Sequence, residues 1–534
     1  MKADRHTLHR SVFFASIVMM VTGIAVSKFI LSMAGLLMAV NWLLEFRYIE
    51  RLRALWPNRM ALLLLALFFV HALWLIPSSD VGYGLHDIRI KLPLLLLPVV
   101  LATEPIMSVQ RLRRILWVFV AAVLLGSVMA WAHYFTVFNP DTDDFRRVVF
   151  FNSSVRFSIL AVMAMLFVLY EAMNQRFRKW AAIVILLWLL GFLVFLQSLT
   201  GMLMFVVALL TWGLVFGYHR AEGLTRRALL ALPVLTLVVG FVVFSSMFNA
   251  YLTPNDHPDN KEPFARESAF GTAYWHVPEN SEIENGHYIY RYIAMPELER
   301  AWGARSDKDF FGNDARGQEL RFTLIRYMAS LGLRKDSLGM AELQPADIDR
   351  VQLGYTSASQ PANPIARRLE STFFEINAYR NGASPQGSTI AQRIAFVQTG
   401  WRVAKKYGLL GVGTGDVNHA MLQQYELDEA KLDADHRRRP HNQYLTLLIA
   451  FGLPGAALFL FLVVNSVVIA FRRADLLATA FAVIAALTFL AEDTLETQVG
   501  ATFFAFFYCL FFVFRVKEDE KRPFHFNEPF RDSL

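Results

Sequence analysis

Apolar stretches long enough to cross a bilayer recur along this chain. A transmembrane helix needs about 17 to 25 predominantly apolar residues. Runs of this kind lie at 11–27, 29–46, 60–76, 88–102, 112–138, 155–170, 180–197, 201–217, 228–247, 443–470, 474–490 and 498–514. The pattern predicts an all-α integral membrane protein with about twelve transmembrane helices.

A long polar segment, residues 248–440, interrupts this pattern. Its many charges of both signs and its aromatic residues are unlike a disordered linker. Helix signals predict one helix between Gly317 and Ala329, a second from Asn363-Pro364 to Arg380, and a third from Thr389 to Gly408. The segment is therefore predicted to be a mainly helical loop domain.

The predicted division has four parts. An N-terminal bundle of about nine helices, residues 1–247, precedes the loop domain. About three C-terminal helices, residues 441–516, follow it, and residues 517–534 form a tail. In the third loop-domain helix, an apolar face of Ile390, Ile394, Val397, Trp401 and Ala404 is expected to lie on the bilayer or against the bundle.

Basic residues gather in every second loop between the apolar runs. They are Arg47, Arg51, Arg53 and Arg59; Arg111, Arg113 and Arg114; Arg176, Arg178 and Lys179; Arg220, Arg226 and Arg227; Arg472 and Arg473; and the tail residues Arg515, Lys517, Lys521 and Arg522. Cytoplasmic loops carry such an excess. Both termini are therefore predicted to be cytoplasmic and 248–440 extracytoplasmic. The exceptions to the rule are Arg89, Lys91, Arg146 and Arg147.

Composition narrows the class further. The chain is 55% hydrophobic and 18% charged, and its net charge of +7 sits largely in the short loops, which argues against a nucleic-acid partner. Its single cysteine, Cys509, excludes an intrachain disulfide and a multi-cysteine metal site.

An ordered set of motifs spans roughly residues 390–460. It consists of Gln392-Arg393-Ile394 leading to Trp401, then 407–415 (YGLLGVGTG), 441–445 (HNQYL) and 451–455 (FGLPG). The set resembles the C-terminal signature of the O-antigen ligase and O-antigen polymerase superfamily, which are integral membrane glycosyltransferases. Many members have a Ser-Arg-Gly-like element after a mid-chain span, whereas this chain has Ser198-Leu199-Thr200-Gly201.

The resemblance implies a multi-pass protein of the bacterial inner membrane with a periplasmic loop domain. It implies transfer of a glycan from an undecaprenyl diphosphate carrier to a sugar hydroxyl, on lipid A–core for a ligase or on a growing glycan for a polymerase. Membrane lipid is the surrounding partner. Arginine can neutralise a diphosphate leaving group, so neither a metal nor another cofactor is expected.

Three residues are the candidate catalytic groups. His441 stands where the polar segment re-enters the membrane, and histidine can accept the acceptor proton near neutral pH. Arg393 and Arg156 are candidates for holding the diphosphate. The alternatives are a helix-terminal cap for His441, a solvated charge for Arg393 and snorkelling to headgroups for Arg156.

Eight residues are weaker candidates for substrate binding: Asn442, Gln443, Arg89, Lys91, Arg146, Arg147, Glu492 and Asp493. Headgroup contact is the alternative for the four basic ones. Glu492 and Asp493, with Glu496, form an acidic turn that would orient His441 or bind the acceptor sugar, and solvated charges are the favoured alternative. The basic run 436–439 is either a lipid-phosphate site or a surface patch, and Gly411-x-Gly413-x-Gly415 is expected to be a flexible turn.

A transporter of lipid-linked sugar is the rival class. It should carry charged residues near the middle of several spans and often internal repeats. The apolar runs here are nearly free of such charges, and the polar residues gather at one face, so the sequence favours the enzyme.

Overall fold

A computed structural model describes residues 2–103, 107–137, 148–261, 263–277, 280, 282–359, 364–386, 388–514 and 516–517. The chain forms two compact units. The first takes in residues 1–136, 146–234 and 393–534, and the second is formed mainly by Leu235–Gln392. The predicted loop segment 248–440 therefore contributes to both units. The boundaries fall inside two helices, directly after Val234 and directly after Gln392.

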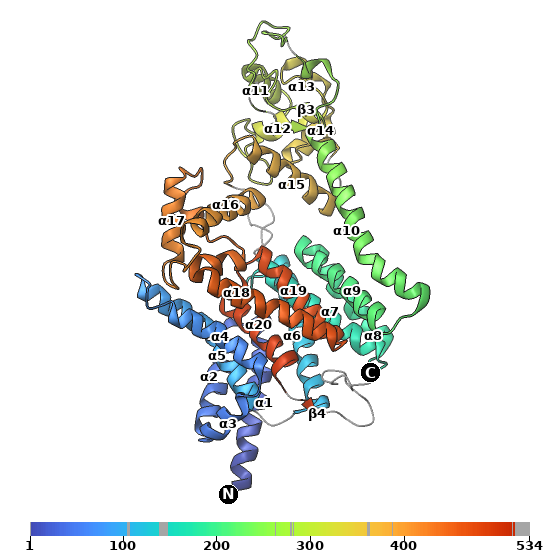
Figure 1. Cartoon of the computed structure of the whole chain (residues 1–534). Coiled ribbons are helices and arrows are strands. Elements are labelled where there is room, and N and C mark those ends of the chain that lie inside the picture. Colours follow the sequence, from blue (N-terminus) through green and yellow to red (C-terminus); the bar gives the residue numbers. More distant parts are fainter. Residues whose placement is uncertain are drawn as a thin grey trace. The chain divides into compact units, whose positions relative to one another are not determined.

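Each apolar run predicted from the sequence coincides with a helix over most of its length, which confirms the all-α class (Figure 1). These helices are α1 (Lys2–Val26), α2 (Lys28–Leu44), α4 (Arg59–Leu73), α5 (Val81–Thr103), α6 (Val109–Thr136), α7 (Ser154–Met173), α8 (Lys179–Phe195), α9 (Leu199–His219), α10 (Gly223–Leu252), α18 (Gln443–Arg472), α19 (Leu476–Ala491) and α20 (Gln498–Tyr508).

Not all of these helices are long enough to be counted as spans. Within the described residues, six helices meet the length and apolarity of a span, namely α1, α6, α7, α9, α10 and α18. A seventh is reached if α2 and α3 (Tyr48–Leu55), which meet at a bend of 114°, count as one broken span. Helices α4, α8 and α19 have 15 to 17 residues. At 1.5 Å per residue each helix is about 25 Å long. This length is shorter than the hydrocarbon core of a bilayer, which is about 30 Å thick. The prediction of about twelve spans is therefore not confirmed, although the all-α membrane class is.

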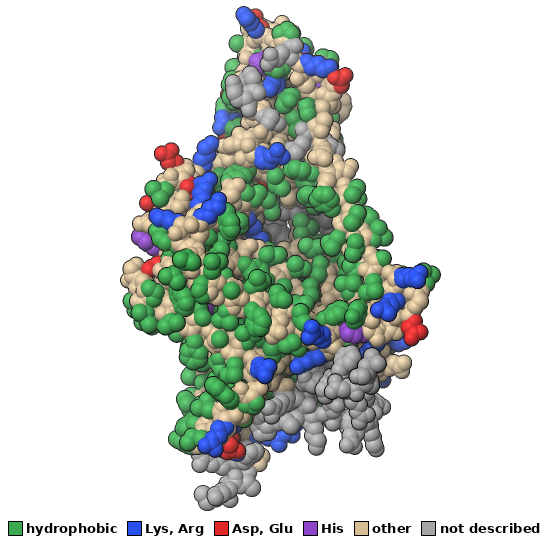
Figure 2. All heavy atoms as spheres, viewed as in Figure 1, with side chains coloured by type: hydrophobic (Ala, Val, Ile, Leu, Met, Phe, Trp, Pro, Cys, Tyr) green, Lys and Arg blue, Asp and Glu red, His purple; other side chains and the backbone are tan. Residues whose placement is uncertain are grey.

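Several of the membrane helices begin at capping side chains that satisfy orphan backbone N–H groups. Ser27 caps α2, Asn58 caps α4, Asp475 caps α19 and Thr497 caps α20. Helix α7 is the most deeply buried of the six spans, since 78% of its 18-residue apolar stretch is buried in the first unit. Hydrophobic side chains cover much of the viewed outer surface of this unit, as expected of a lipid-facing protein (Figure 2).

The second unit is a small helical domain with its own core. It contains α11 (Met295–Gly303), α12 (Leu320–Ser330), α13 (Ser337–Glu342), α14 (Pro345–Gln352), α15 (Pro364–Arg380) and the antiparallel pair β2 (Ile283–Glu284) and β3 (His287–Tyr288). Trp302, Leu324, Tyr327 and Met328 are fully buried in one cluster. Helices α12 and α15 confirm the predictions, although Asn363, the predicted cap of α15, lies outside the described residues.

Helix α16 (Thr389–Tyr407) confirms the third predicted helix of the loop segment, and whether its apolar face lies on the bilayer stays a prediction. On the predicted apolar face, Val397 and Trp401 are 39% and 51% exposed while Ala404 is buried, and the neighbouring Phe396 is buried as well. The helix also packs closely against the segment before α18, since a Cβ on Gly400 would stand 2.7 Å from the Pro440 side chain.

Helix α18 contains a break at Gly452, whose φ of 62° is non-helical. The helical segment that carries residues 443–451 therefore ends inside the unit. The freed carbonyls of Ile449 and Ala450 accept hydrogen bonds from the N–H groups of Val412 and Gly413, each at 2.9 Å. Such partners are needed because an unsatisfied backbone group in the bilayer is costly.

The glycine run 411–415 is not the flexible turn expected from the sequence. It is wedged between α18 and the turn that joins α4 to α5. A Cβ on Gly415 would stand 2.1 Å from the carbonyl oxygen of Asp80. The adjacent Asp416 carboxylate accepts hydrogen bonds from Ser79 N at 2.7 Å and Asp80 N at 2.9 Å. The glycines are required here for close backbone packing.

The predicted orientation can be tested with introduced cysteines. Lys308→Cys, at an exposed position of the second unit, should react with a membrane-impermeant thiol reagent in cells whose outer barrier is permeable. Ser108→Cys, exposed before α6 on the predicted cytoplasmic side, should react only after lysis. The native Cys509 is fully buried and should give little background. The reverse labelling pattern would rule out this orientation.

Candidate active site

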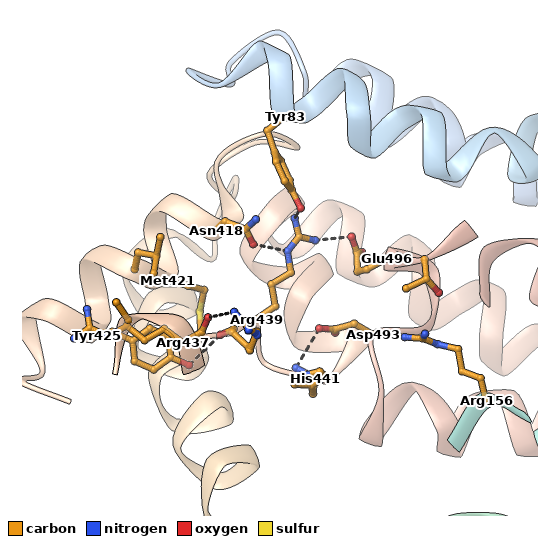
Figure 3. Close-up of a pocket in the computed structure, with 14 residues that line it drawn as sticks. Tyr83, Arg156, Asn418, Met421, Tyr425, Arg437, Arg439, His441, Asp493 and Glu496 are labelled. Atoms are coloured by element: carbon orange, nitrogen blue, oxygen red, sulfur yellow. Dashed lines mark hydrogen bonds and ion pairs between the residues drawn. The ribbon is translucent and has the colours of Figure 1, made fainter. Parts of the chain in front are cut away.

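A cavity of about 470 Å³ opens in the first unit at the point where the chain enters α18. Its walls come from the start of α5, the start of α7, helix α17 (Val417–Leu427) with the segment up to 441, and the turn after α19 (Figure 3). Four arginines, Arg156, Arg437, Arg438 and Arg439, line it together with two carboxylates, Asp493 and Glu496. Guanidinium groups are therefore in excess, which suits an anionic ligand.

His441 lies in the wall of this cavity, directly before α18. Its backbone has a left-handed φ of 50°, and its N–H donates to Asp493 Oδ2 at 3.1 Å. The ring packs on Phe396 with 5.6 Å between centroids. Its Nδ1 is buried without a hydrogen-bond partner among the described residues, and the nearest carboxylate oxygen, of Glu492, is 4.0 Å away.

The surroundings of His441 favour its neutral form. Burial lowers the pKa of the imidazole, and the nearby Glu492 carboxylate offsets this only in part. A neutral imidazole at neutral pH is able to accept a proton. The side chain remains 36% exposed, so a ligand in the cavity can reach it.

Arg439 is the most firmly held arginine of the cavity. It donates to Glu496 Oε2 at 2.5 Å, to Asn418 Oδ1 at 2.7 Å and to the Tyr83 hydroxyl at 3.0 Å (Figure 3). The charge of Glu496 raises the pKa of Arg439 against the opposing effect of burial. Its guanidinium is thereby fixed in place and charged.

Lys91 completes a buried network of alternating charges behind Arg439. Its Nζ donates to Asp87 Oδ1 at 2.7 Å and to Glu496 Oε2 at 2.9 Å, and the residue is 0% exposed. Although burial opposes the shift, Lys91 and Arg439 hold the pKa of Glu496 well below its usual value. Lys91 thus has protein partners, and the alternative of headgroup contact is wrong.

Arg156 lines the cavity from the first turn of α7, as Figure 3 shows. Its Nε is buried without a hydrogen-bond partner among the described residues. Buried donors normally have partners, so an unpaired guanidinium Nε in the wall of a cavity makes Arg156 a candidate for ligand binding. Its place in the wall also argues against simple snorkelling to headgroups.

Arg393 does not line the cavity but stands behind His441. Its Nη2 donates to Glu492 Oε1 at 2.5 Å, and the Glu492 side chain is only 7% exposed.

Asp493, also buried, accepts from the Thr446 hydroxyl at 2.8 Å, and burial and then Glu496 raise its pKa to about 6. The expectation of a solvated acidic turn is therefore wrong, because each carboxylate has a partner in the protein.

The two amides after His441 hold the chain rather than face the cavity. Asn442 caps α18, accepting from Leu445 N at 3.0 Å, and donates to the Leu490 carbonyl at 3.1 Å. Gln443 is 0% exposed and bridges Glu496 and the N–H of Leu495. Their contacts fix the 441–443 segment to the last turn of α19 and to the turn that follows it, and the fully buried Gln443 offers no surface to a substrate.

The remaining predicted residues lie elsewhere. Arg89 is exposed and contacts His86 at 3.0 Å, outside the cavity lining. Arg146 and Arg147 lie outside the described residues. No cluster of three or more His, Cys, Asp or Glu side chains suited to a metal occurs among the residues that the structure describes.

Sequence reasoning missed the roles of Arg439, Tyr83 and Asn418. The basic run 436–439 is visible in the sequence, but hydrophobic periodicity does not distinguish a buried arginine from an arginine of a surface patch. The position of Arg439, two residues before His441, was the available signal. Lys91 and Glu496 pair across a sequence separation of 405 residues, and no motif spacing could reveal such a pair.

Apolar helices of spanning length, with almost no sheet among the described residues, define an all-α integral membrane protein. A family model described as O-Antigen ligase matches residues 184–460, more than half of the chain. The chain therefore belongs to the O-antigen ligase family of membrane glycosyltransferases. The match includes Arg393 and His441 but neither Arg156 nor the carboxylates 492–496. No curated protein gives a significant match.

Proposed function

We propose that this protein transfers a glycan from an undecaprenyl diphosphate carrier to a sugar hydroxyl, with lipid A–core as the acceptor. The observation that carries the proposal is the convergence of four arginines beside a histidine whose pKa is lowered. The family supports the reaction class. Extension of a growing glycan is the alternative within the same family.

The residues can be given separate tasks in the reaction. The guanidinium groups of Arg156 and Arg439 would hold the diphosphate oxygens and neutralise the charge that develops when the bond from the anomeric carbon to the diphosphate breaks. His441 would accept the proton of the acceptor hydroxyl as that oxygen bonds to the anomeric carbon. The products are the elongated acceptor and the lipid diphosphate.

Arg393 then acts as a positioning residue in this proposal. It fixes Glu492, whose carboxylate stands 4.0 Å from His441 Nδ1. Such an orienting group behind a base is a common arrangement. Asn442 and Gln443 would likewise position the histidine through their contacts with the turn after α19.

The purified full-length protein with a lipid-diphosphate glycan donor and lipid A–core acceptor should form product in excess EDTA, because arginines supply the positive charge. Product would be followed by the shift in acceptor mobility on a gel. Activity lost in EDTA and restored by magnesium or manganese would contradict the arginine-based mechanism.

The glycan profile of a deletion strain distinguishes the two acceptors. Uncapped core points to ligation, and a single repeat unit on core points to polymerisation.

A further inference from the structure

The second unit contains a cavity of its own that the proposed reaction does not use. It has a volume of about 490 Å³, which falls in the range of small-molecule sites. All of its lining residues belong to the second unit. Its polar lining is formed by side chains from several separate segments, which is typical of a site for a polar ligand.

One face of α15 forms a wall of this cavity. Glu370, Phe374 and Ala378 follow one another at intervals of four, and Glu375 and Tyr379 lie on the adjoining stripe. Residues four apart share a helix face. The helix thus presents aromatic rings and carboxylates side by side.

An arginine packs against this wall of the cavity. The guanidinium of Arg326 lies 3.5 Å from the centre of the Phe374 ring and donates to Glu284 Oε2 at 2.8 and 3.0 Å. Glu284 is itself buried. These contacts fix the Phe374 ring and one edge of the cavity before any ligand enters, and preorganisation favours binding.

Glu370 is the one acidic lining residue for which the described structure shows neither a hydrogen bond nor an ion pair. Burial and then the neighbouring Glu284 carboxylate raise the pKa of Glu370 to about 7. Near neutral pH this group exists in both forms, so it can donate or accept a hydrogen bond.

The lining chemistry selects among ligand classes. Four carboxylates, Glu282, Glu284, Glu370 and Glu375, stand against two guanidinium groups, so an acidic ligand is disfavoured. A simple cation would use the carboxylates but none of the donors of Arg316, Gln318 or Gln386. Sugar hydroxyls both donate and accept, and the apolar face of a sugar ring can lie on an aromatic side chain.

We propose that this cavity binds carbohydrate, and that it prefers neutral or amino-substituted sugar rings to acidic ones. Resting on the proposed function, the bound sugar would be part of the glycan of the donor or of the acceptor. The second unit would then hold the glycan while the first unit carries out the transfer.

Binding can be measured without transfer by using full-length protein with His441→Asn in nanodiscs. Saturation-transfer NMR should detect binding of an N-acetylglucosamine trimer and of a glucosamine trimer to this protein. A galacturonic acid trimer should bind more weakly than either. Phe374→Ala should weaken both favoured ligands about fivefold to tenfold through loss of the aromatic face. Glu370→Gln should reduce the preference for the glucosamine trimer over the acid trimer while leaving the fold intact.

Glu342→Gln, an exposed acid on α13 outside the cavity, is the matched control and should change nothing. No binding of either favoured trimer, or binding unchanged in both cavity variants, would overturn the proposal. In the active protein, a rise in KM for the donor alone or for the acceptor alone in Phe374→Ala identifies which glycan occupies the site. The NMR result stands even if transfer itself is absent, so the two proposals fail separately.

Discussion

Replacement of His441 by asparagine should reduce glycan transfer by about 10²–10⁴-fold, the usual contribution of general acid–base catalysis. Asparagine tolerates the left-handed φ of 50° at this position, so the chain can keep its path into α18. Its amide cannot accept a proton near neutral pH. The rate should be measured with donor and acceptor both saturating, and normalised to the amount of folded protein in the membrane.

His436→Asn is the matched control for this substitution. His436 is exposed, lies five residues before His441 and does not line the cavity. Its replacement should leave the rate unchanged.

Donor binding should survive in His441→Asn and weaken in Arg156→Lys, because a lysine cannot reproduce the guanidinium fork. Near-normal transfer by His441→Asn would reduce the histidine to a structural residue and leave the base unidentified.

Replacement of Glu496 by alanine should have the largest effect on stability. The Glu496 carboxylate is bonded to Lys91 at 2.9 Å, Arg439 at 2.5 Å and Gln443 at 3.1 Å. Removing it leaves two buried cations with less compensation, and breaking one partner of a buried pair costs about 3–5 kcal/mol. The free energy of unfolding, followed in mixed micelles by added denaturing detergent, should fall by that amount.

The matched control for Glu496 is Glu50→Ala. Glu50 also pairs with an arginine at 2.5 Å, but both side chains are exposed, and exposed pairs contribute little. This variant should unfold like the unaltered protein. If Glu496→Ala and Glu50→Ala proved equally stable, the buried network would not hold the site together as described.

The helices could be predicted from the sequence, whereas their lengths as spans could not. Apolar runs end where hydropathy ends, but α4 stops at Leu73, three residues before the predicted limit, because the chain turns at Trp74. The break at Gly452 was equally hidden, since its cause is a hydrogen-bonding partner about forty residues earlier. Turns that depend on distant backbone leave no local periodicity.

The candidate site was predictable in part. Polar residues at a membrane boundary pointed to His441 and its neighbours, and the structure places His441 and Arg156 in one cavity. The roles of the acidic residues were not predictable, because solvated and buried carboxylates have the same sequence signature. Only the fold shows that Lys91, Asp87 and Glu496 neutralise one another.

The contact between the α4–α5 turn and residues 413–416 has a consequence for biogenesis. Asp416 binds Ser79 and Asp80 across more than 330 residues, so the chain must be synthesised at least as far as residue 416 of 534 before that contact can form. Synthesis proceeds from the N-terminus, and contacts of such high sequence separation form late. During insertion, Lys91 and Asp87 lack their partner Glu496, because Glu496 is synthesised only with the last helices. A nascent chain therefore has no assembled cavity, and truncated translation products should be unable to bind the donor.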